Sequence, residues 1–217
     1  MKLFSIFTFV RLLNKFKMLE QNEKITLKQD FENMLAGCQE KIFLRTYFVS
    51  GLKEDCDILF WRMHPSLDYL QDICAKTFAV GIGKYMEIRY TYIGVKEFKI
   101  ENIEELNSKI GIYPYFLLHP LNKSFKWYEL SEEERNNIIE ERKKIFLNYN
   151  KILENFFVSF GIDDQDMIVT REAADINVLV QATAELKKQK SKSFTIGDKP
   201  VFLCIGKDLR EILDNIS

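Results

Sequence analysis

The chain has 217 residues, of which 47% are hydrophobic and 29% are charged, and its formal net charge is −1. This composition is typical of one large or two small folded domains with a sizeable core, and it excludes a largely disordered chain. The balanced charge excludes a basic surface for nucleic acid or for an anionic membrane, so we expect any charge chemistry to be local.

The N-terminal segment Leu3–Leu12 is predicted to form a strand. It resembles the start of a signal peptide, but Arg11 interrupts the apolar run and no small-residue cleavage site follows. No stretch reaches the roughly 20 apolar residues of a membrane-spanning helix, so we expect no membrane partner. An amphipathic helix is expected next over Leu27–Glu40, with Phe31 and Leu35 on its inner side.

A hairpin, a second helix and a return strand complete the first half. Ile42–Ser50 and Ile58–Met63 are rich in β-branched and aromatic residues and flank a polar turn, which predicts two antiparallel strands. A helix is then expected to open at Ser66 and to end near Gly81. Glu87–Gly94 returns as a strand.

The segment Trp127–Tyr149 predicts the clearest helix of the chain. Ser131 followed three residues later by Glu134 is the pattern of a capping box. Acidic residues at the start and lysines near the end suit the two poles of the helix dipole.

The inward stripe of this predicted helix contains an arginine. Ile138 and Ile145 follow helical spacing, and the residue due between them on the same face is Arg142. A buried guanidinium is costly unless it meets an anion or reaches water along its apolar stem. Two interpretations stay open. Arg142 is a solvated or salt-bridged arginine, or the helix forms the bottom of a pocket and Arg142 points into it.

The two halves of the chain contain a repeated pattern. Phe48–Arg62, with the sequence FVSGLKEDCDILFWR, lies beside Phe157–Arg171, with the sequence FVSFGIDDQDMIVTR. Each copy has an acidic turn, an aspartate, three apolar residues and a closing arginine, so that Asp57 matches Asp166. Self-similarity in this order indicates two copies of one structural unit.

Each unit is predicted to contain a strand, a helix, two strands, a helix and a strand. This order is the ferredoxin-like βαββαβ arrangement, an α+β fold with antiparallel sheets, here in tandem. We predict an N-terminal domain over 1–95, a polar connector over 96–114 and a C-terminal domain over 115–217. The last of these ends in a short helix, Leu209–Ile216.

The cysteines and histidines do not follow the spacing of a metal site. Cys38, Cys56, Cys74 and Cys204 lie far apart, without the short paired spacing that zinc requires. We interpret them as small core residues in a reducing cytoplasm, and we expect no metal site.

Four stretches together resemble the chlorite dismutase superfamily, which includes the coproheme decarboxylases and other haem-dependent members. They are FVSGLKEDCDILFWRMHPSLDYLQ in the first half and, in the second, YFLLHPLNKSFKWYELSEEER, SFGIDDQDMIV and KPVFLCIGKDLREIL. The resemblance implies tandem ferredoxin-like domains, assembly into a ring that is usually a pentamer, and one haem pocket in each C-terminal domain.

The residues at the pocket positions depart from the family pattern. By resemblance, Arg142 stands where relatives have the histidine that ligates the haem iron, and Lys190 where they have the glutamate that orients it. Glu154 stands at the position of a distal arginine or glutamine above the haem. His119 replaces the tyrosine that coproheme decarboxylases use as a radical relay.

Two pocket positions keep the family's residues. Lys123 stands at a lysine that contacts a haem propionate in relatives, and Trp127 belongs to the Trp-Tyr motif beside the pocket. Each also has an alternative interpretation without a ligand: Lys123 as a solvated loop residue and Trp127 as a packing residue.

Three functions follow, of which the second is preferred. The first is a haem-dependent oxidoreductase of the peroxidase, chlorite dismutase or coproheme decarboxylase type, with haem or coproheme as cofactor. The second is a non-haem member without a cofactor, whose pocket binds a small anion at Arg142 and Lys190. The third is an oligomeric scaffold in which Arg142 and Glu154 form an internal ion pair. Whether the protein is an enzyme stays open.

Overall fold

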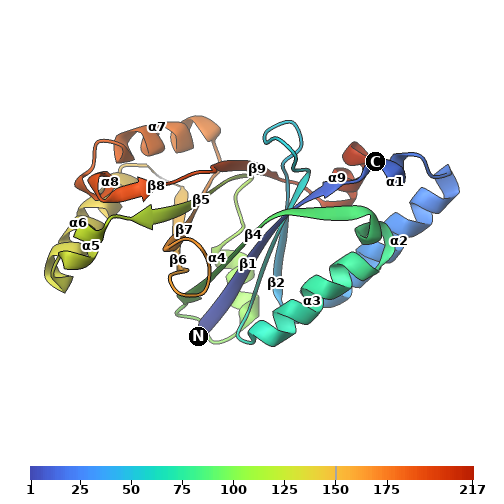
Figure 1. Cartoon of the computed structure of the whole chain (residues 1–217), viewed down its shortest axis with the longest axis horizontal. Helices are drawn as coiled ribbons and strands as arrows, with labels where there is room; N and C mark the ends of the chain where they lie inside the picture. Colours follow the sequence, from blue (N-terminus) through green and yellow to red (C-terminus); the bar gives the residue numbers. More distant parts are fainter. Residues whose placement is uncertain (150) are drawn as a thin grey trace.

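One nine-stranded antiparallel β-sheet forms the centre of the structure. Each unit contributes one half of it, called below the first and the second sheet, and helices lie beyond both halves (Figure 1). The structure is a computed structural model that describes residues 1–149 and 151–217. Within each unit the strands have the order expected of a split βαβ fold, β4-β1-β3-β2 in the first and β9-β5-β7-β6 in the second. The predicted tandem ferredoxin-like fold is therefore confirmed.

The first unit holds four strands and three helices of at least one turn. Their bounds are β1 Lys2–Leu12, α1 Asn14–Lys17, α2 Gln21–Gln39, β2 Phe43–Phe48, β3 Ile58–His64, α3 Leu67–Ala79, the 3₁₀ helix η1 Gly81–Tyr85, and β4 Met86–Glu97. Helix α2 begins six residues before the predicted start, because its first turns are polar and exposed and carry no apolar period.

The connector and the second unit follow in the predicted order. Their bounds are η2 Ile103–Glu105, α4 Leu106–Lys109, β5 Tyr115–Lys123, α5 Phe125–Glu129, α6 Glu132–Leu147, β6 Ile152–Val158, β7 Met167–Ala173, α7 Ile176–Leu186, α8 Lys190–Ser193, β8 Thr195–Gly197, β9 Phe202–Gly206 and α9 Leu209–Ile216. The predicted helix over Trp127–Tyr149 is wrong as one element, since extended Leu130 separates α5 from α6. The capping box of Ser131 and Glu134 is confirmed at the start of α6.

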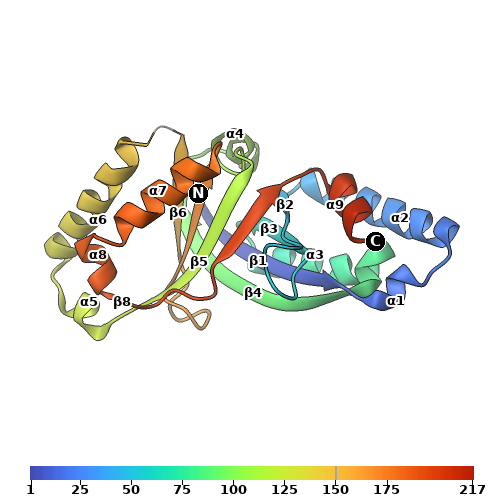
Figure 2. The ribbon, with the colours of Figure 1, turned by 90° about the horizontal axis from the view of Figure 1, so that it is seen from above.

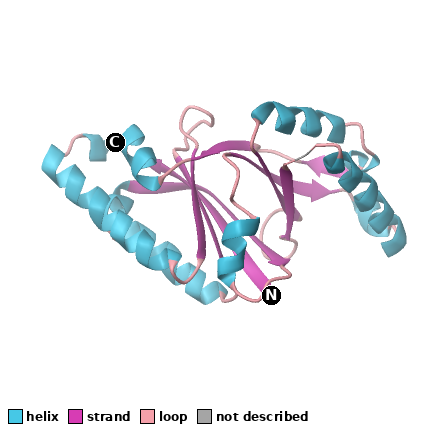
Figure 3. Cartoon of the chain, turned by 180° about the vertical axis from the view of Figure 1, so that it is seen from behind, coloured by secondary structure: helices cyan, strands magenta, loops and turns pink. Residues whose placement is uncertain are grey.

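The two sheets join at both edges into a closed ring of strands. Strand β2 pairs with β9 at Tyr47 and Gly206, and β4 pairs with β6 at Val95 and Val158. These contacts are short, so they join the edges of the two units while pairing only part of each edge strand. Figures 2 and 3 show most of the helices in two groups at the two ends of the strands, and Figure 2 shows α4 beside the strands between these groups.

Successive side chains of each strand point to opposite faces of the sheet, so the strands contribute to two hydrophobic cores. The inner core lies between the two sheets, and the outer core lies between the first sheet and its helices. On β1, Leu3, Phe7 and Phe9 face the space between the sheets, whereas Ile6 and Val10 face the helices of the first unit. The inner core is largely aromatic, with Phe7 stacked on Trp61 and Phe9 stacked on Phe202.

The connector and the last helix both pack onto the first unit or the inner core. Phe98, Leu106 and Ile110 of the polar connector are buried in the inner core. Helix α9 follows the second unit in sequence, but its Ile212 and Leu213 lie in the outer core of the first unit, beside α2. Figure 1 shows the C-terminus on that side.

The repeated turns have matching hydrogen bonds. The carboxylate of Asp57 accepts the backbone N–H of Leu12 at 2.8 Å, at the end of β1. The carboxylate of Asp166 accepts the N–H of Lys123 at 2.6 Å, at the end of β5. The matched aspartates therefore hold the hairpin turn of each unit against the end of its first strand.

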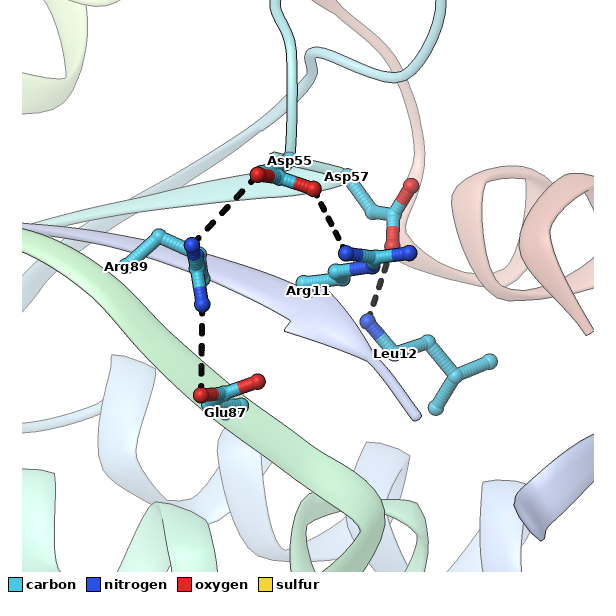
Figure 4. Close-up of polar contacts among 6 residues, drawn as sticks. All are labelled: Arg11, Leu12, Asp55, Asp57, Glu87 and Arg89. Atoms are coloured by element: carbon cyan, nitrogen blue, oxygen red, sulfur yellow. Dashed lines mark hydrogen bonds and ion pairs between the residues drawn. The ribbon is translucent and has the colours of Figure 1, made fainter. Parts of the chain in front are cut away.

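A surface ion-pair network further fixes the turn of the first unit (Figure 4). Asp55, which has a left-handed φ of 59°, accepts from Arg11 at 2.5 Å and from Arg89 at 3.4 Å. Arg89 also pairs with Glu87 at 3.2 Å. Among the described residues, no helix is long and apolar enough to cross a membrane.

Candidate functional site

A cavity of about 530 Å³ lies on the outer face of the second sheet, beneath the helices of that unit. It is lined by residues of β5, α6, β7, α7, α8 and β8 and of the loop that follows: His119, Leu121, Arg142, Arg171, Thr183, Leu186, Lys187, Ser191, Lys192, Thr195, Asp198, Lys199 and Val201. Five of these residues carry a permanent positive charge and one carries a carboxylate, so the lining is strongly cationic.

Two buried guanidinium groups share one carboxylate oxygen at this cavity. Arg142 lies between Ile138 and Ile145 on the buried stripe of α6, as predicted. Its Nη2 donates to Oε1 of Glu154 at 2.5 Å, and Nε of Arg171 donates to the same oxygen at 2.7 Å. All three side chains are at most 10% exposed, so water screens the excess positive charge poorly.

The lysines of the cavity add to this excess. Lys187 and Lys199 line the cavity with Lys192, whose ammonium makes a short ion pair with Asp198. The carboxylates of Glu154 and Asp198 therefore offset two of the five positive charges. An anion that entered the cavity would be attracted by the rest.

His119 is a neutral imidazole in the cavity wall. Burial lowers the pKa of His119 to about 3, and the neighbouring charge of Arg171 acts in the same direction. Its Nε2 atom is buried without a hydrogen-bond partner in the described residues. A neutral imidazole has one nitrogen lone pair, so His119 can accept a hydrogen bond or hold a metal.

Lys123 and Trp127 lie together behind α8 and β8. The Lys123 ammonium donates to the carbonyl of Ser191 and to the hydroxyl of Thr195, both at 3.2 Å, and lies 4.7 Å from the centre of the Trp127 ring. Burial lowers the pKa of Lys123 to about 8, with a further contribution from Arg142. The amine is thus anchored within the fold and does not line the cavity.

The structure brings most of the predicted site residues together. Arg142, Glu154 and His119 meet at or beside the cavity, and the ion pair of Arg142 with Glu154, left open as one interpretation, is present. Lys190 does not join them, because it is exposed at the start of α8 and does not line the cavity. Lys192, one half-turn further along α8, lies there instead.

Sequence reasoning missed the roles of Arg171, Lys192 and Thr183. A signal for Arg171 was available in the repeat, because a closing arginine recurs in both units and Glu154 lies opposite it in the β6–β7 register. Lys192 and Thr183 carry no comparable signal, since a lysine or threonine on a helix is ordinarily solvated.

A larger groove of about 760 Å³ lies between α2, β2, residues 111–114 and α9. Its charged side chains already have partners: Arg210 pairs with Glu32 at 2.8 Å, and Arg45 donates to the carbonyls of Gly111 and Asn107. The smaller cavity is the better candidate, because its cations outnumber their carboxylate partners.

Comparison with known proteins agrees with this fold. The family model described as chlorite dismutase matches residues 24–207. The chain is 22% identical over 160 residues to the coproheme decarboxylase of Mycolicibacterium smegmatis, covering 72% of this chain and 69% of that protein. It is 28% identical over 148 residues to the coproheme decarboxylase of Staphylococcus carnosus, covering 59% of each.

Solved structures show the same fold. A mutant chlorite dismutase from Candidatus Nitrospira defluvii superposes with a TM-score of 0.88 at 19% identity, covering 99% of this chain and 95% of that one. The enzyme of the same organism in complex with imidazole also gives 0.88, at 18% identity and with 99% and 94% coverage. Because the family model spans most of its length, the chain belongs to the chlorite dismutase family.

Proposed function

We propose that this protein is a non-haem member of its family and binds an anion in the cavity of the second unit. The proposal rests on one contact, the 2.5 Å hydrogen bond between Arg142 and Glu154. Family resemblance puts Arg142 at the axial position and Glu154 at the distal position, on opposite faces of a haem. Two side chains in direct contact leave no space for a porphyrin between them.

The chemistry of Arg142 supports the same conclusion. A guanidinium is protonated at every accessible pH and has no free lone pair for iron. The position of the orienting glutamate is also lost, because Lys190 lies exposed outside the cavity. The residues present at these positions therefore do not fit a haem held in the family's manner.

The cationic lining favours an anion in its place. Arg142 and Arg171 share a single oxygen of Glu154, and Lys187, Lys192 and Lys199 surround the same space. Two buried guanidinium groups with one carboxylate oxygen between them are costly, and a bound carboxylate or phosphate would offset that cost with charge-assisted hydrogen bonds. Lys187 and Lys199 are exposed, so their attraction for an anion is weakened by solvent.

Thermal unfolding in the presence of anions tests the proposal. Inorganic phosphate and benzoate, each titrated at constant ionic strength, are expected to raise the melting temperature; at ten times Kd the stabilisation is about 1.4 kcal/mol, or about 3–5 °C. Arg142→Met is expected to lose this response. Lys143→Met, at an exposed position of α6, is the matched control and keeps it. If no anion stabilises the parent protein, the cavity has no ligand and the scaffold interpretation holds.

A haem-dependent oxidoreductase is the second candidate, and His119 favours it. Its imidazole is neutral and its buried Nε2 has no partner among the described residues, so it could ligate a metal. The matched proteins of Mycolicibacterium smegmatis and Staphylococcus carnosus are coproheme decarboxylases.

Titration with haemin and with coproheme separates the two candidates. The parent protein is expected to give no sharp Soret band at stoichiometric addition. Arg142→His combined with Glu154→Gln removes the blocking ion pair and restores an imidazole, so this double variant is expected to gain haem affinity. A sharp stoichiometric band with histidine ligation in the parent protein would overturn the non-haem proposal.

We further propose that the chain assembles into a homo-oligomeric ring, as the family resemblance implies. A pentamer of this 25.7 kDa chain is expected to have a mass of about five times that value. Light scattering coupled to size-exclusion chromatography measures it directly, and a monomer at micromolar concentration would contradict the proposal.

A further inference from the structure

One short stretch of chain covers the candidate cavity. Residues 187–201, called here the cover segment, connect α7 to β9 and contain α8 and β8. They supply seven of the thirteen residues that line the cavity, and the other six come from β5, α6, β7 and α7. The cavity therefore has one wall that belongs to the framework of the second unit and one wall that belongs to the cover segment.

The cover segment is packed weakly between two well-packed ends. Of its fifteen residues, all of which the structure describes, only Ser191 is buried. It begins directly after Leu186, which is buried, and ends directly before Phe202, which is fully buried. Segments with few buried apolar side chains open at a lower free energy than the core around them. The stretch between the two fixed ends is thus the part of this unit that can move at the lowest cost.

The end of β5 holds the cover segment against the framework. Strand β8 pairs with β5 at two positions, and the backbone N–H of Ser124 donates to the carbonyl of Phe194 at 2.8 Å. The buried ammonium of Lys123 donates to the carbonyl of Ser191 and to the hydroxyl of Thr195, both at 3.2 Å. These contacts lie close together, so they can break and form as one latch.

Both walls of the cavity carry an excess of positive charge. The cover segment contains five lysines and a single carboxylate, Asp198. The framework wall presents Arg142 and Arg171, which share the carboxylate of Glu154. Like charges on facing walls favour their separation, although solvent weakens the contribution of the exposed lysines. An anion between the walls would be attracted by both.

We infer that the cover segment is a lid, which opens without unfolding of the remaining chain and which a bound anion holds closed. This inference rests on the proposed anion-binding function and names how access to the same site is controlled. An anion in the cavity contacts the framework wall and the cover segment together, so it binds the closed form more tightly than the open form. Binding then lowers the population of the open form.

Limited proteolysis with trypsin, followed by mass spectrometry, measures the opening. The cover segment offers cleavage sites after Lys187, Lys188, Lys190 and Lys192. Arg62 is fully buried on β3, so cleavage after it reports unfolding of the whole chain. We expect cleavage in the cover segment well before cleavage after Arg62, because opening of the lid requires less free energy than global unfolding.

The same assay with an anion tests closure. Inorganic phosphate or benzoate is added at constant ionic strength, to ten times the Kd that calorimetry gives. Cleavage in the cover segment is expected to slow by about elevenfold, since the open population falls by the factor 1 + [L]/Kd. Hydrolysis of a small chromogenic substrate, measured in parallel, shows that the anion does not inhibit trypsin. Arg142→Met is expected to lose this protection.

A variant of the latch tests what holds the lid. Thr195→Val removes one acceptor of the Lys123 ammonium with little change in volume, and it is expected to raise the cleavage rate of the cover segment about tenfold without anion. Thr26→Val, at an exposed position of α2, is the matched control and keeps the parent rate.

The outcomes separate this inference from the proposal beneath it. Anion binding in calorimetry without a change in cleavage rate would overturn the lid and leave the anion site standing. Cleavage of the cover segment no faster than cleavage after Arg62 would also overturn the lid, because the segment would then open only with the whole chain. Binding of neither anion would overturn the anion site, and closure by an anion with it. If Thr195→Val fails to fold, the response of the parent protein to the anion still decides.

Discussion

The two units of the chain have the same framework and a buried arginine at the same place, yet only the second surrounds its arginine with charge. Arg62 lies opposite Leu44 in the β2–β3 register, and Arg171 lies opposite Glu154 in the β6–β7 register. Arg62 is fully buried and donates only to the hydroxyls of Thr8 and Thr77, without a carboxylate partner among the described residues. The first unit thus holds a solitary cation in an apolar outer core.

The difference shows how one repeat can hold either a core or a site. In the first unit α2, α3 and α9 pack apolar side chains such as Leu35, Leu70 and Leu213 against the sheet. In the second unit Arg142 on α6 takes a place on the buried stripe, and a cavity remains beneath α7 and α8. A glutamate in place of the leucine opposite the arginine, and a second arginine that shares this glutamate, distinguish the unit with the proposed anion site from the unit with an apolar core.

The largest effect is expected from making the second unit resemble the first. Glu154→Leu would leave Arg142 and Arg171 buried without a carboxylate, and it is expected to lower the free energy of unfolding by about 3–5 kcal/mol. Urea denaturation measures the change. Glu140→Leu, on the exposed face of α6, is the control and is expected to stay within about 0.5 kcal/mol of the parent. A loss below about 1 kcal/mol for Glu154→Leu would mean that the triad contributes little.

The next effect concerns pH and the histidine of the second unit. Because the pKa of His119 is lowered to about 3 in the folded protein, the unfolded chain binds the extra proton between pH 6.5 and 3. Its contribution to stability is complete above about pH 6.5 and is lost as the pH falls, by about 3 kcal/mol between pH 6.5 and 4. His119→Gln is expected to remove this part of the acid sensitivity. If the unfolding free energy depends on pH with the same slope in the parent and the variant, His119 is exposed to solvent and its pKa is not lowered by folding.

The two buried arginines are expected to respond with opposite signs to the same substitution. Arg62→Met removes a desolvated cation that has no carboxylate partner, so it is expected to be neutral or to stabilise by about 1–2 kcal/mol. Arg171→Met removes one of two partners of Glu154 and is expected to destabilise by about 1–3 kcal/mol. Denaturant midpoints give both values. The same sign for both variants would break the contrast between the units.

The smallest effects are expected where the units are alike. Asp57→Ala and Asp166→Ala each remove one charge-assisted bond, to the N–H of Leu12 and of Lys123 respectively. Each is expected to cost about 1–2 kcal/mol, and the two costs should agree within about 0.5 kcal/mol. Thermal unfolding provides the comparison, and a difference above about 1 kcal/mol would show that the turns have diverged in role.

Local patterns gave most of the fold correctly. Short-range patterns can be recognised in a single sequence, because they depend on neighbours a few residues away. They are the repeat around Asp57 and Asp166, the alternation along the strands and the capping box at Ser131. The early start of α2 was missed, because its polar first turns show no apolar period. The separate short helix α5 before Leu130 was also missed, although the capping box at Ser131 marked the start of α6.

The candidate site could be predicted only in part from the sequence. Arg142 could be identified because a cation interrupts an apolar stripe, which is a periodic signal. Lys190 and Lys192 could not be told apart, because a short helix between two loops has no period long enough to show which lysine faces inward. The domain bounds stay a prediction: 1–95 for the N-terminal domain, 96–114 for the connector and 115–217 for the C-terminal domain.

The amino-acid sequence by itself determined that this chain is two copies of one βαββαβ unit and that an arginine lies within an otherwise apolar helix face. Only the tertiary structure decided that Arg142 and Arg171 meet on the same oxygen of Glu154, beside a cavity that five cationic residues line. The physical reason is range: periodicity and capping act between residues near in sequence, whereas the balance of buried charge depends on strands and helices brought together by folding.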